Sequence, residues 1–233
     1  MKKQILFIIA THGNEKIGIE AVKILENKGL EKYFDVLIAN PKALEKNVRL
    51  IEADLNRSYP GDAKSKIYEE RIAFENFKIA KKYRYIIDLH EASQGTDDFI
   101  IMPRKKLSKT FPLEFINLKK VLLWPDPKGP ISQILKNAIE LEFGSKNRPR
   151  KLIINRCTLI LENFIKNIHQ LPDNKITGNK KIFYVYGKLL TNKNIELKLI
   201  DFKKVKIEKE KFYPLLTNQY IKDGIACYKM KKL

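Results

Sequence analysis

The stretch Gln4-Ile-Leu-Phe-Ile-Ile-Ala-Thr-His-Gly-Asn-Glu15 decides the fold of this chain. Its first part, residues 4–10, is an apolar run of the kind that forms a strand buried on both faces of a sheet. From Glu15 to Lys28 the apolar residues recur near helical spacing, and Gly29 ends the pattern. A second apolar run covers residues 34–39. Strand, helix and strand in this order predict an α/β fold.

Two histidines directly follow predicted strands. His12 follows residues 4–10, and His90 follows the apolar run 83–89. The carboxyl ends of strands are where open α/β sheets bind ligands, so we expect these side chains to meet at one edge. With Glu15 they supply two imidazoles and one carboxylate, a known ligand set for catalytic zinc that leaves a fourth position for water. The third histidine, His169, lies near the end of a predicted helix and is expected to be either a surface residue or a core residue with its hydrogen bonds satisfied.

The remaining pattern predicts further elements and a domain boundary. Helices are expected at 64–82 and 151–171, and strands at 99–102, 121–124 and 138–143. After Pro172 the sequence changes to short β-rich runs at 181–190, 195–200 and 205–207. We therefore predict a first domain over residues 1–172 and a small β-rich domain over residues 173–233.

Composition narrows the class of protein. The chain has 233 residues, 44% of them hydrophobic, which suffices for one large core with or without a small second domain. It contains no apolar run long enough to span a membrane and no leader pattern, which predicts a soluble cytoplasmic protein. Cys157 and Cys227 lie far apart, so neither a disulfide framework nor a thiolate metal cluster is indicated. Cys157 falls on the apolar stripe of a predicted helix and is expected in the core.

The formal net charge of +19 is spread along the whole chain and is mostly lysine. Short basic clusters such as 104–106 are not part of a recognisable nucleic-acid module, so a solvated basic surface is the favoured interpretation. Such a surface still attracts an anionic substrate. Binding of nucleic acid is the less favoured alternative.

Polar residues between and after the two histidine loops suggest substrate contacts. Asn56 and Arg57 place an amide beside a guanidinium fork, which can hold a carboxylate by two parallel hydrogen bonds; a surface turn is the alternative. In the strand 138–143, Glu140 and Glu142 point to the same side because strand side chains alternate. Glu142 is nearer the carboxyl end, where a carboxylate could act as general base toward a metal-bound water.

Four motifs together resemble those of the aspartoacylase and succinylglutamate desuccinylase family, which is related to the zinc carboxypeptidases. They are Thr-His-Gly-Asn-Glu at 11–15, Ala-Asp-Leu-Asn-Arg-Ser-Tyr-Pro-Gly at 53–61, Ile-Asp-Leu-His at 87–90 and Leu-Glu-Phe-Gly at 141–144. The resemblance covers nearly the whole chain and implies a three-layer α/β/α, zinc-carboxypeptidase-like domain followed by a small C-terminal β-rich domain.

The resemblance also implies a role for each candidate residue. One zinc ion per chain is expected on His12, Glu15 and His90. Independently of the resemblance, Asp54 or Asp88 is a candidate to hydrogen-bond and orient these ligands. The implied substrate machinery is Glu142 as catalytic carboxylate, Arg49 polarising the carbonyl, Asn56 and Arg57 binding the amino-acid carboxylate, and Tyr220 closing the site.

One position departs from the family pattern. Where aspartoacylase has a further arginine about ten residues before the catalytic glutamate, this chain has Ser132, with Lys128 and Lys136 nearby. The expected activity is therefore zinc-dependent hydrolysis of the linear amide of an N-acyl amino acid or a similar small anionic substrate, with the acyl group, the amino acid and the oligomeric state left open. The alternatives are a zinc carboxypeptidase acting on peptides and a non-catalytic basic protein that binds an anionic metabolite or nucleic acid.

Overall fold

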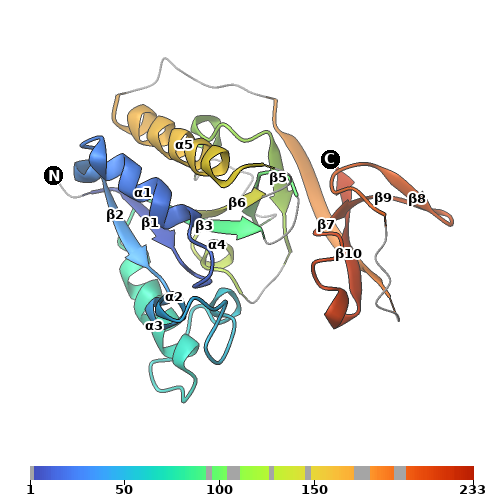
Figure 1. Ribbon diagram of the computed structural model, residues 1–233, viewed down its shortest axis with the longest axis horizontal. Helices are drawn as coiled ribbons and strands as arrows, with labels where there is room; N and C mark the ends of the chain where they lie inside the picture. Colours follow the sequence, from blue (N-terminus) through green and yellow to red (C-terminus); the bar gives the residue numbers. More distant parts are fainter. Residues whose placement is uncertain are drawn as a thin grey trace.

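The computed structural model describes residues 3–92, 96–103, 111–125, 129–144, 148–170, 179–191 and 198–233. Ten strands form one sheet in the order β2-β1-β3-β6-β4-β5-β7-β10-β9-β8. Helices α1 and α5 lie over one face of its first part, and α3 lies on the other side (Figure 1). This is the predicted three-layer α/β/α arrangement with a C-terminal β region.

The helices and strands have the following bounds. The strands are β1 Ile5–Ile9, β2 Phe34–Ile38, β3 Tyr85–Ala92, β4 Phe99–Met102, β5 Lys120–Leu123, β6 Ala138–Gly144, β7 Lys181–Leu190, β8 Val205–Ile207, β9 Glu210–Leu215 and β10 Ile225–Lys232. The α-helices are α1 Ile17–Asn27, α2 Pro41–Glu45, α3 Tyr68–Ala80, α4 Ile131–Ile134 and α5 Arg150–Gln170. A short 3-10 turn, Leu55–Arg57, carries the predicted Asn-Arg pair.

Strand β1 is buried along its whole length because the layers on both sides of the sheet cover it. Phe7 belongs to the core cluster that includes residues of α1 and α5. Its neighbours Leu6 and Ile8 belong to a second cluster with residues of α3 and α4. Alternate side chains thus enter opposite layers, which explains a continuous apolar run where a half-exposed strand would alternate. Parallel pairing of β1 with β2 and with β3 then brings the carboxyl ends of these strands to one edge.

Most predicted elements are confirmed with small shifts at their ends. Helix α3 begins at Tyr68, later than the predicted residue 64, since Asp62 accepts a hydrogen bond from the Lys64 amide and holds a turn there. The predicted strand 121–124 is β5, one residue earlier. The predicted strand 195–200 is wrong where it can be followed: 198–200 is not a strand, and 195–197 lies outside the described residues. Strands β9 and β10 were not predicted.

The C-terminal strands continue the main sheet. β7 pairs in parallel with β5, and β10 then pairs antiparallel with both β7 and β9. In Figure 1 these orange and red strands extend to one side of the helices. The boundary predicted near residue 173 falls in the segment 171–178, outside the described residues, and the division into two domains stays a prediction.

Two further sequence expectations concern burial. Cys157 and Cys227 are both free and fully buried, as expected for Cys157. His169 is exposed near the end of α5, where its ring lies beside Tyr33. Among the residues described, no helix has the length and apolar character needed to cross a membrane.

Candidate active site

The loop after β1 carries two of the predicted metal ligands. Ala10 ends the strand region with φ 53°, which turns the chain toward the carboxyl edge of the sheet. Gly13 then passes so close to α2 that a Cβ atom there would lie 2.0 Å from the carbonyl carbon of Ala43. The Gly13 amide donates to the carbonyl of Arg49 at 3.3 Å. Glycine at this position therefore lets the loop that carries His12 and Glu15 pack directly against the segment that carries Arg49.

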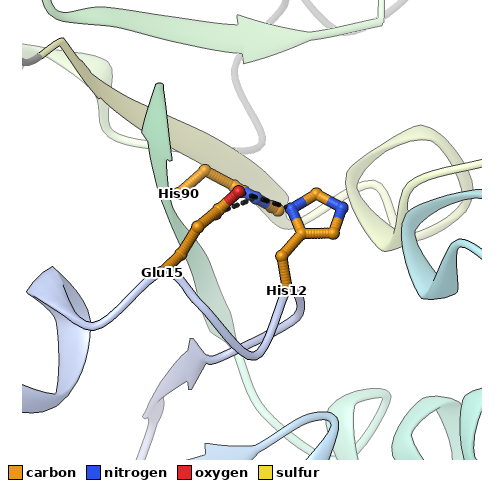
Figure 2. Close-up of side chains that lie close together, drawn as sticks. All are labelled: His12, Glu15 and His90. Carbon is orange, nitrogen blue, oxygen red and sulfur yellow. Dashed lines mark hydrogen bonds and ion pairs between the residues drawn. The ribbon is translucent and has the colours of Figure 1, made fainter. Parts of the chain in front are cut away.

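Figure 2 shows the Glu15 carboxylate close to both imidazoles. Its Oε1 lies 2.6 Å from Nδ1 of His12, and its Oε2 lies 3.2 Å from Nδ1 of His90. One ligand atom from each of the three residues lies within 4.8 Å of the others. The backbone amide of Glu91 donates to Glu15 Oε2 at 3.1 Å and fixes the carboxylate further. Two residues from the β1 loop and one from β3 thus form a compact cluster.

The other ring nitrogens face carboxylates on the side away from Glu15. His12 Nε2 lies 3.1 Å from Asp54 Oδ1, and His90 Nε2 lies 3.2 Å from Asp88 Oδ2. Thr11 donates its hydroxyl to the other oxygen of Asp88 at 2.9 Å. In metal sites, carboxylates beside the non-ligating nitrogen orient the ring and leave the ligating nitrogen unprotonated. Both aspartates suggested from the sequence are therefore in position for this role.

The charges of the cluster suit a cation. Burial alone would lower the pKa of both imidazoles, yet the neighbouring carboxylates Glu15, Asp54 and Asp88 raise the pKa values of His12 and His90. Burial also opposes ionisation of Glu15, but the two imidazoles hold the pKa of its carboxyl well below its usual range. Without a metal ion, protons on the rings balance the buried carboxylates. A divalent cation can replace that positive charge, and the nitrogen, nitrogen and oxygen donors are those of catalytic zinc sites.

Arg49 lies at the side of the cluster. Its guanidinium donates to Asp54 Oδ2 at 3.1 Å and lies 3.5 Å from Glu15 Oε1. The side chain remains 44% exposed, so it reaches from these anchors toward the pocket. Burial would lower the pKa of this guanidinium, but the charges of Asp54 and Glu15 raise it, and the group stays positive.

The segment 51–57 presents Asn56 and Arg57, and Glu69 holds it in place. The carboxylate of Glu69 is fully buried and accepts from the backbone amides of Ile51, Glu52 and Ala53 at 2.7 to 3.1 Å. Sequence reasoning did not single out Glu69. A signal existed, because Glu69, Ala73 and Asn76 occupy the buried face of α3, and a carboxylate on such a face needs hydrogen-bond donors.

Glu140 and Glu142 point to the same side of β6, as predicted, and the sheet register relates them to the cluster. His90 on β3 pairs with Glu142, and Asp88 pairs with Glu140. Glu142 is half-buried, and burial together with the carboxylates of Glu15 and Glu140 raises its pKa to about 8. Glu140 is nearly fully buried, accepts from the Asn56 amide at 3.3 Å and also accepts from the Ser132 hydroxyl.

All eight residues predicted to contact metal or substrate line one pocket of about 690 Å³. They are His12, Glu15, Arg49, Asn56, Arg57, His90, Glu142 and Tyr220. Four buried polar atoms of pocket residues have no hydrogen-bond partner among the described residues: Asn56 Oδ1, His90 Nε2, Glu91 Oε2 and Gln133 Nε2. Ser132 is buried, Lys136 is exposed, and Lys128 lies outside the described residues. The roles of the eight residues remain predictions, but their convergence on one cavity is what those roles require.

The fold together with this cluster at the strand ends defines a zinc-carboxypeptidase-like α/β protein. The solved structure of murine aminoacylase 3 has the same fold: the two superpose with a TM-score of 0.76 at 19% sequence identity, over 99% of this chain and 95% of that one.

A family model for the succinylglutamate desuccinylase/aspartoacylase catalytic domain matches residues 2–168, and the chain belongs to this family. A protein of Prochlorococcus marinus (strain MIT 9215) named "Probable aspartoacylase" is 30% identical over 205 residues, which cover 77% of this chain and 67% of the relative. An N-acyl-aromatic-L-amino acid amidohydrolase (carboxylate-forming) of Xenopus tropicalis is 35% identical over 173 residues, 60% of this chain and 54% of the relative. Family membership supports hydrolase activity that removes an acyl group.

Proposed function

We propose that this protein is a zinc-dependent deacylase that hydrolyses the amide of a small N-acyl amino acid to a carboxylic acid and a free amine. The observation that carries the proposal is the shared pocket. It joins the His12, Glu15 and His90 cluster to the half-buried carboxylate of Glu142 and to the Asn56 and Arg57 pair. The names of the relatives, an aspartoacylase and an N-acyl amino acid amidohydrolase, agree with it.

Zinc is the proposed metal because two imidazoles and one carboxylate, all buried, match its catalytic ligand set. A zinc ion held there supplies a Lewis acid that polarises the scissile carbonyl and makes water nucleophilic near neutral pH. Among the described residues, the cluster offers three protein ligands, which leaves room for water and substrate.

The chain's own residues then move the protons. The Glu142 carboxylate takes a proton from the attacking water and passes it to the amide nitrogen as the carbon–nitrogen bond breaks. The raised pKa of Glu142, about 8, suits a group that must both accept and release a proton near neutral pH. A bound cation lowers this value, because it favours the ionised carboxylate.

The two arginines have separate tasks in this scheme. Arg49, held by Asp54 beside the metal cluster, donates to the oxyanion that develops on the carbonyl. Arg57 is exposed to the pocket and, with Asn56, binds the carboxylate of the amino-acid half. Tyr220 lines the same pocket from the C-terminal region and covers the bound substrate.

The test combines metal analysis with a substrate screen. Metal content of the purified protein is measured, and N-acetyl and N-succinyl amino acids are assayed for amine release beside small peptides with free C-termini. We expect one zinc per chain and hydrolysis of N-acyl amino acids that is lost with a chelator and restored by zinc. Faster cleavage of peptides would assign a carboxypeptidase instead. No bound metal after zinc loading, together with no hydrolysis, would favour the non-catalytic binding protein.

A further inference from the structure

The pocket has two chemically different parts. One part holds the charged residues of the metal cluster and the two arginines. The other is lined by apolar and aromatic side chains: Phe99, Ile101, Trp124, Leu216 and Tyr228. The residues of the proposed reaction lie in the first part. The second part can therefore contact a portion of the substrate that does not react and so determine which substrate binds.

The sheet register places the apolar part directly beside Glu142 and Glu140. Strand β4 pairs antiparallel with β6, with Phe99 opposite Glu142 and Ile101 opposite Glu140. Side chains of directly paired residues point to the same face of a sheet. Phe99 and Ile101 therefore extend the face that carries the two glutamates, away from His90 and toward β5.

Aromatic rings from distant parts of the chain complete the apolar part of the pocket. Trp124 follows β5, and its ring lies 4.7 Å from the ring of Tyr228 on β10 in an edge-on arrangement. The ring of Tyr228 also lies 5.9 Å from that of Tyr220. Trp124 and Tyr228 are only half-buried and both line the pocket, so a ligand there can remove further aromatic surface from water.

The floor of the pocket between the two parts presents mainly hydrogen-bond acceptors, and the positive charge nearest to Glu140 belongs to the metal cluster, where His90 Nε2 lies 3.8 Å from Glu140 Oε2. Glu140 lies there with Ser132 and Asn56 as hydrogen-bond donors, and Asn56 Oδ1 has no partner among the described residues. Apart from the imidazoles of His12 and His90, the cations among the described residues that line the pocket are Arg49, Arg57 and the exposed Lys222. Arg49 is engaged by Asp54 and Glu15, and Lys222 lies next to Asp223 on an exposed turn. A second carboxylate placed on this floor would meet oxygen atoms without a paired cation.

We propose that this apolar part is the subsite for the amino-acid side chain, and that it selects an aromatic or branched aliphatic side chain over an acidic one. The proposal rests on the deacylase function above. Asn56 binds the substrate carboxylate in that scheme, and its amide contacts Glu140, whose paired residue is Ile101. The carboxylate and the side chain of an amino acid are bonded to the same α-carbon. A carboxylate bound at Asn56 therefore places the side chain against the neighbouring apolar part of the pocket. The acyl group lies on the opposite side of the scissile bond.

The chain offers a direct binding readout, because Trp124 is its only tryptophan. Intrinsic fluorescence of the zinc-loaded protein is titrated with L-phenylalanine, L-leucine and L-aspartate, the amines that hydrolysis would release. In parallel, kcat/KM is measured for the matched N-acetyl derivatives and for N-acetylglycine. We expect phenylalanine or leucine to shift the tryptophan emission at lower concentration than aspartate. Their N-acetyl derivatives should have kcat/KM about 10- to 200-fold above the aspartate derivative, the range that burying an apolar group gives.

Three variants test the assignment. Trp124→Ala should lower the ratio of kcat/KM for N-acetylphenylalanine to that for N-acetylglycine by about tenfold or more. Glu140→Gln should raise the relative kcat/KM of N-acetylaspartate, because it removes a carboxyl from the floor. Tyr186→Ala, which truncates an exposed aromatic residue on β7, should leave the ratios as in the wild type.

Other outcomes overturn specific statements. Preference for N-acetylaspartate that disappears in Lys222→Ala would assign this part of the pocket to a carboxylate. Rates that follow the acyl group in an acetyl, hexanoyl and benzoyl series on alanine, and not the amino-acid side chain, would assign it to the acyl half. If phenylalanine and leucine shift the fluorescence but the protein hydrolyses no N-acyl amino acid, the proposed subsite stands and the deacylase function is refuted. Absence of both signals would refute both.

Discussion

Replacing Glu142 with glutamine is expected to abolish most turnover while metal stays bound. The substitution keeps the size of the side chain and its place opposite His90 in the sheet, but the amide can no longer accept a proton from water. Removing an acid-base group lowers kcat by about two to four orders of magnitude. At 1.36 kcal/mol per factor of ten, this corresponds to about 3 to 5 kcal/mol of transition-state stabilisation. Zinc content should equal that of the wild type, since Glu142 is not in the ligand cluster.

The pH dependence gives a second readout of the same residue. In the protein without metal, burial and nearby carboxylates raise the pKa of Glu142 to about 8. A general base works only when ionised, so kcat/KM should rise with pH on its acidic limb, and the bound cation should bring the midpoint below 8. The Gln variant should lack this limb. Wild-type turnover or loss of zinc in Glu142→Gln would refute the assignment of Glu142 as the base. If only Glu140→Gln lowered turnover, Glu140 would be the base instead.

Three further variants test the metal ligands, the binding of the substrate carboxylate by Arg57, and the close packing of the loop at Gly13. His90→Ala should lose most bound zinc, because two protein ligands remain; undiminished metal content contradicts the assignment. Arg57→Lys should raise KM for carboxylate substrates, because lysine keeps the charge but lacks the planar fork of the guanidinium. If the wild type hydrolyses a substrate with a free carboxylate and the matched substrate with an amidated carboxylate equally fast, Arg57 does not bind the substrate carboxylate. Gly13→Ala places a Cβ 2.0 Å from the Ala43 backbone and should lower both Tm and zinc affinity, whereas Gly187→Ala, which meets only the flexible end of Lys229, should change neither.

The convergence of His12, Glu15 and His90 could be predicted because its signal is local. His12 and His90 each follow an apolar run, and parallel strands bring such positions to one edge whatever the details of packing. The choice between Glu140 and Glu142 depended on how β6 is aligned with β3. Residues two apart in a strand point to the same side, so sequence periodicity alone does not distinguish them. The pairing of His90 with Glu142 supplies that register and puts the two side chains on one face.

Long-range contacts could not be predicted in the same way. Glu69 binds backbone amides of residues 51–53, and nothing in the local pattern names the donors that a buried carboxylate will find. The contact between Trp124 and Tyr228 joins segments more than 100 residues apart, and the strand that carries Tyr228 was not predicted. The run 195–200 resembled a strand because Ile195, Leu197 and Leu199 alternate with polar residues, yet its described part, 198–200, is not a strand. Alternation shows that a segment fits a half-buried strand, but a strand also needs a partner.

The charged part of the pocket comes mainly from the segment that the family model matches, whereas the apolar part comes from that segment and from the C-terminal strands together. The family model covers residues 2–168, which contain the metal cluster, Glu142 and the Asn56 and Arg57 pair. Of the apolar lining, Phe99, Ile101 and Trp124 also lie within that range. Leu216, Tyr220 and Tyr228, which complete that side of the pocket, lie beyond it. Similarity within 2–168 therefore supports a shared reaction, whereas the side chain that the pocket accepts also depends on C-terminal strands that the family model does not describe. A relative's substrate name carries over to this chain only if its C-terminal strands complete the same apolar part of the pocket.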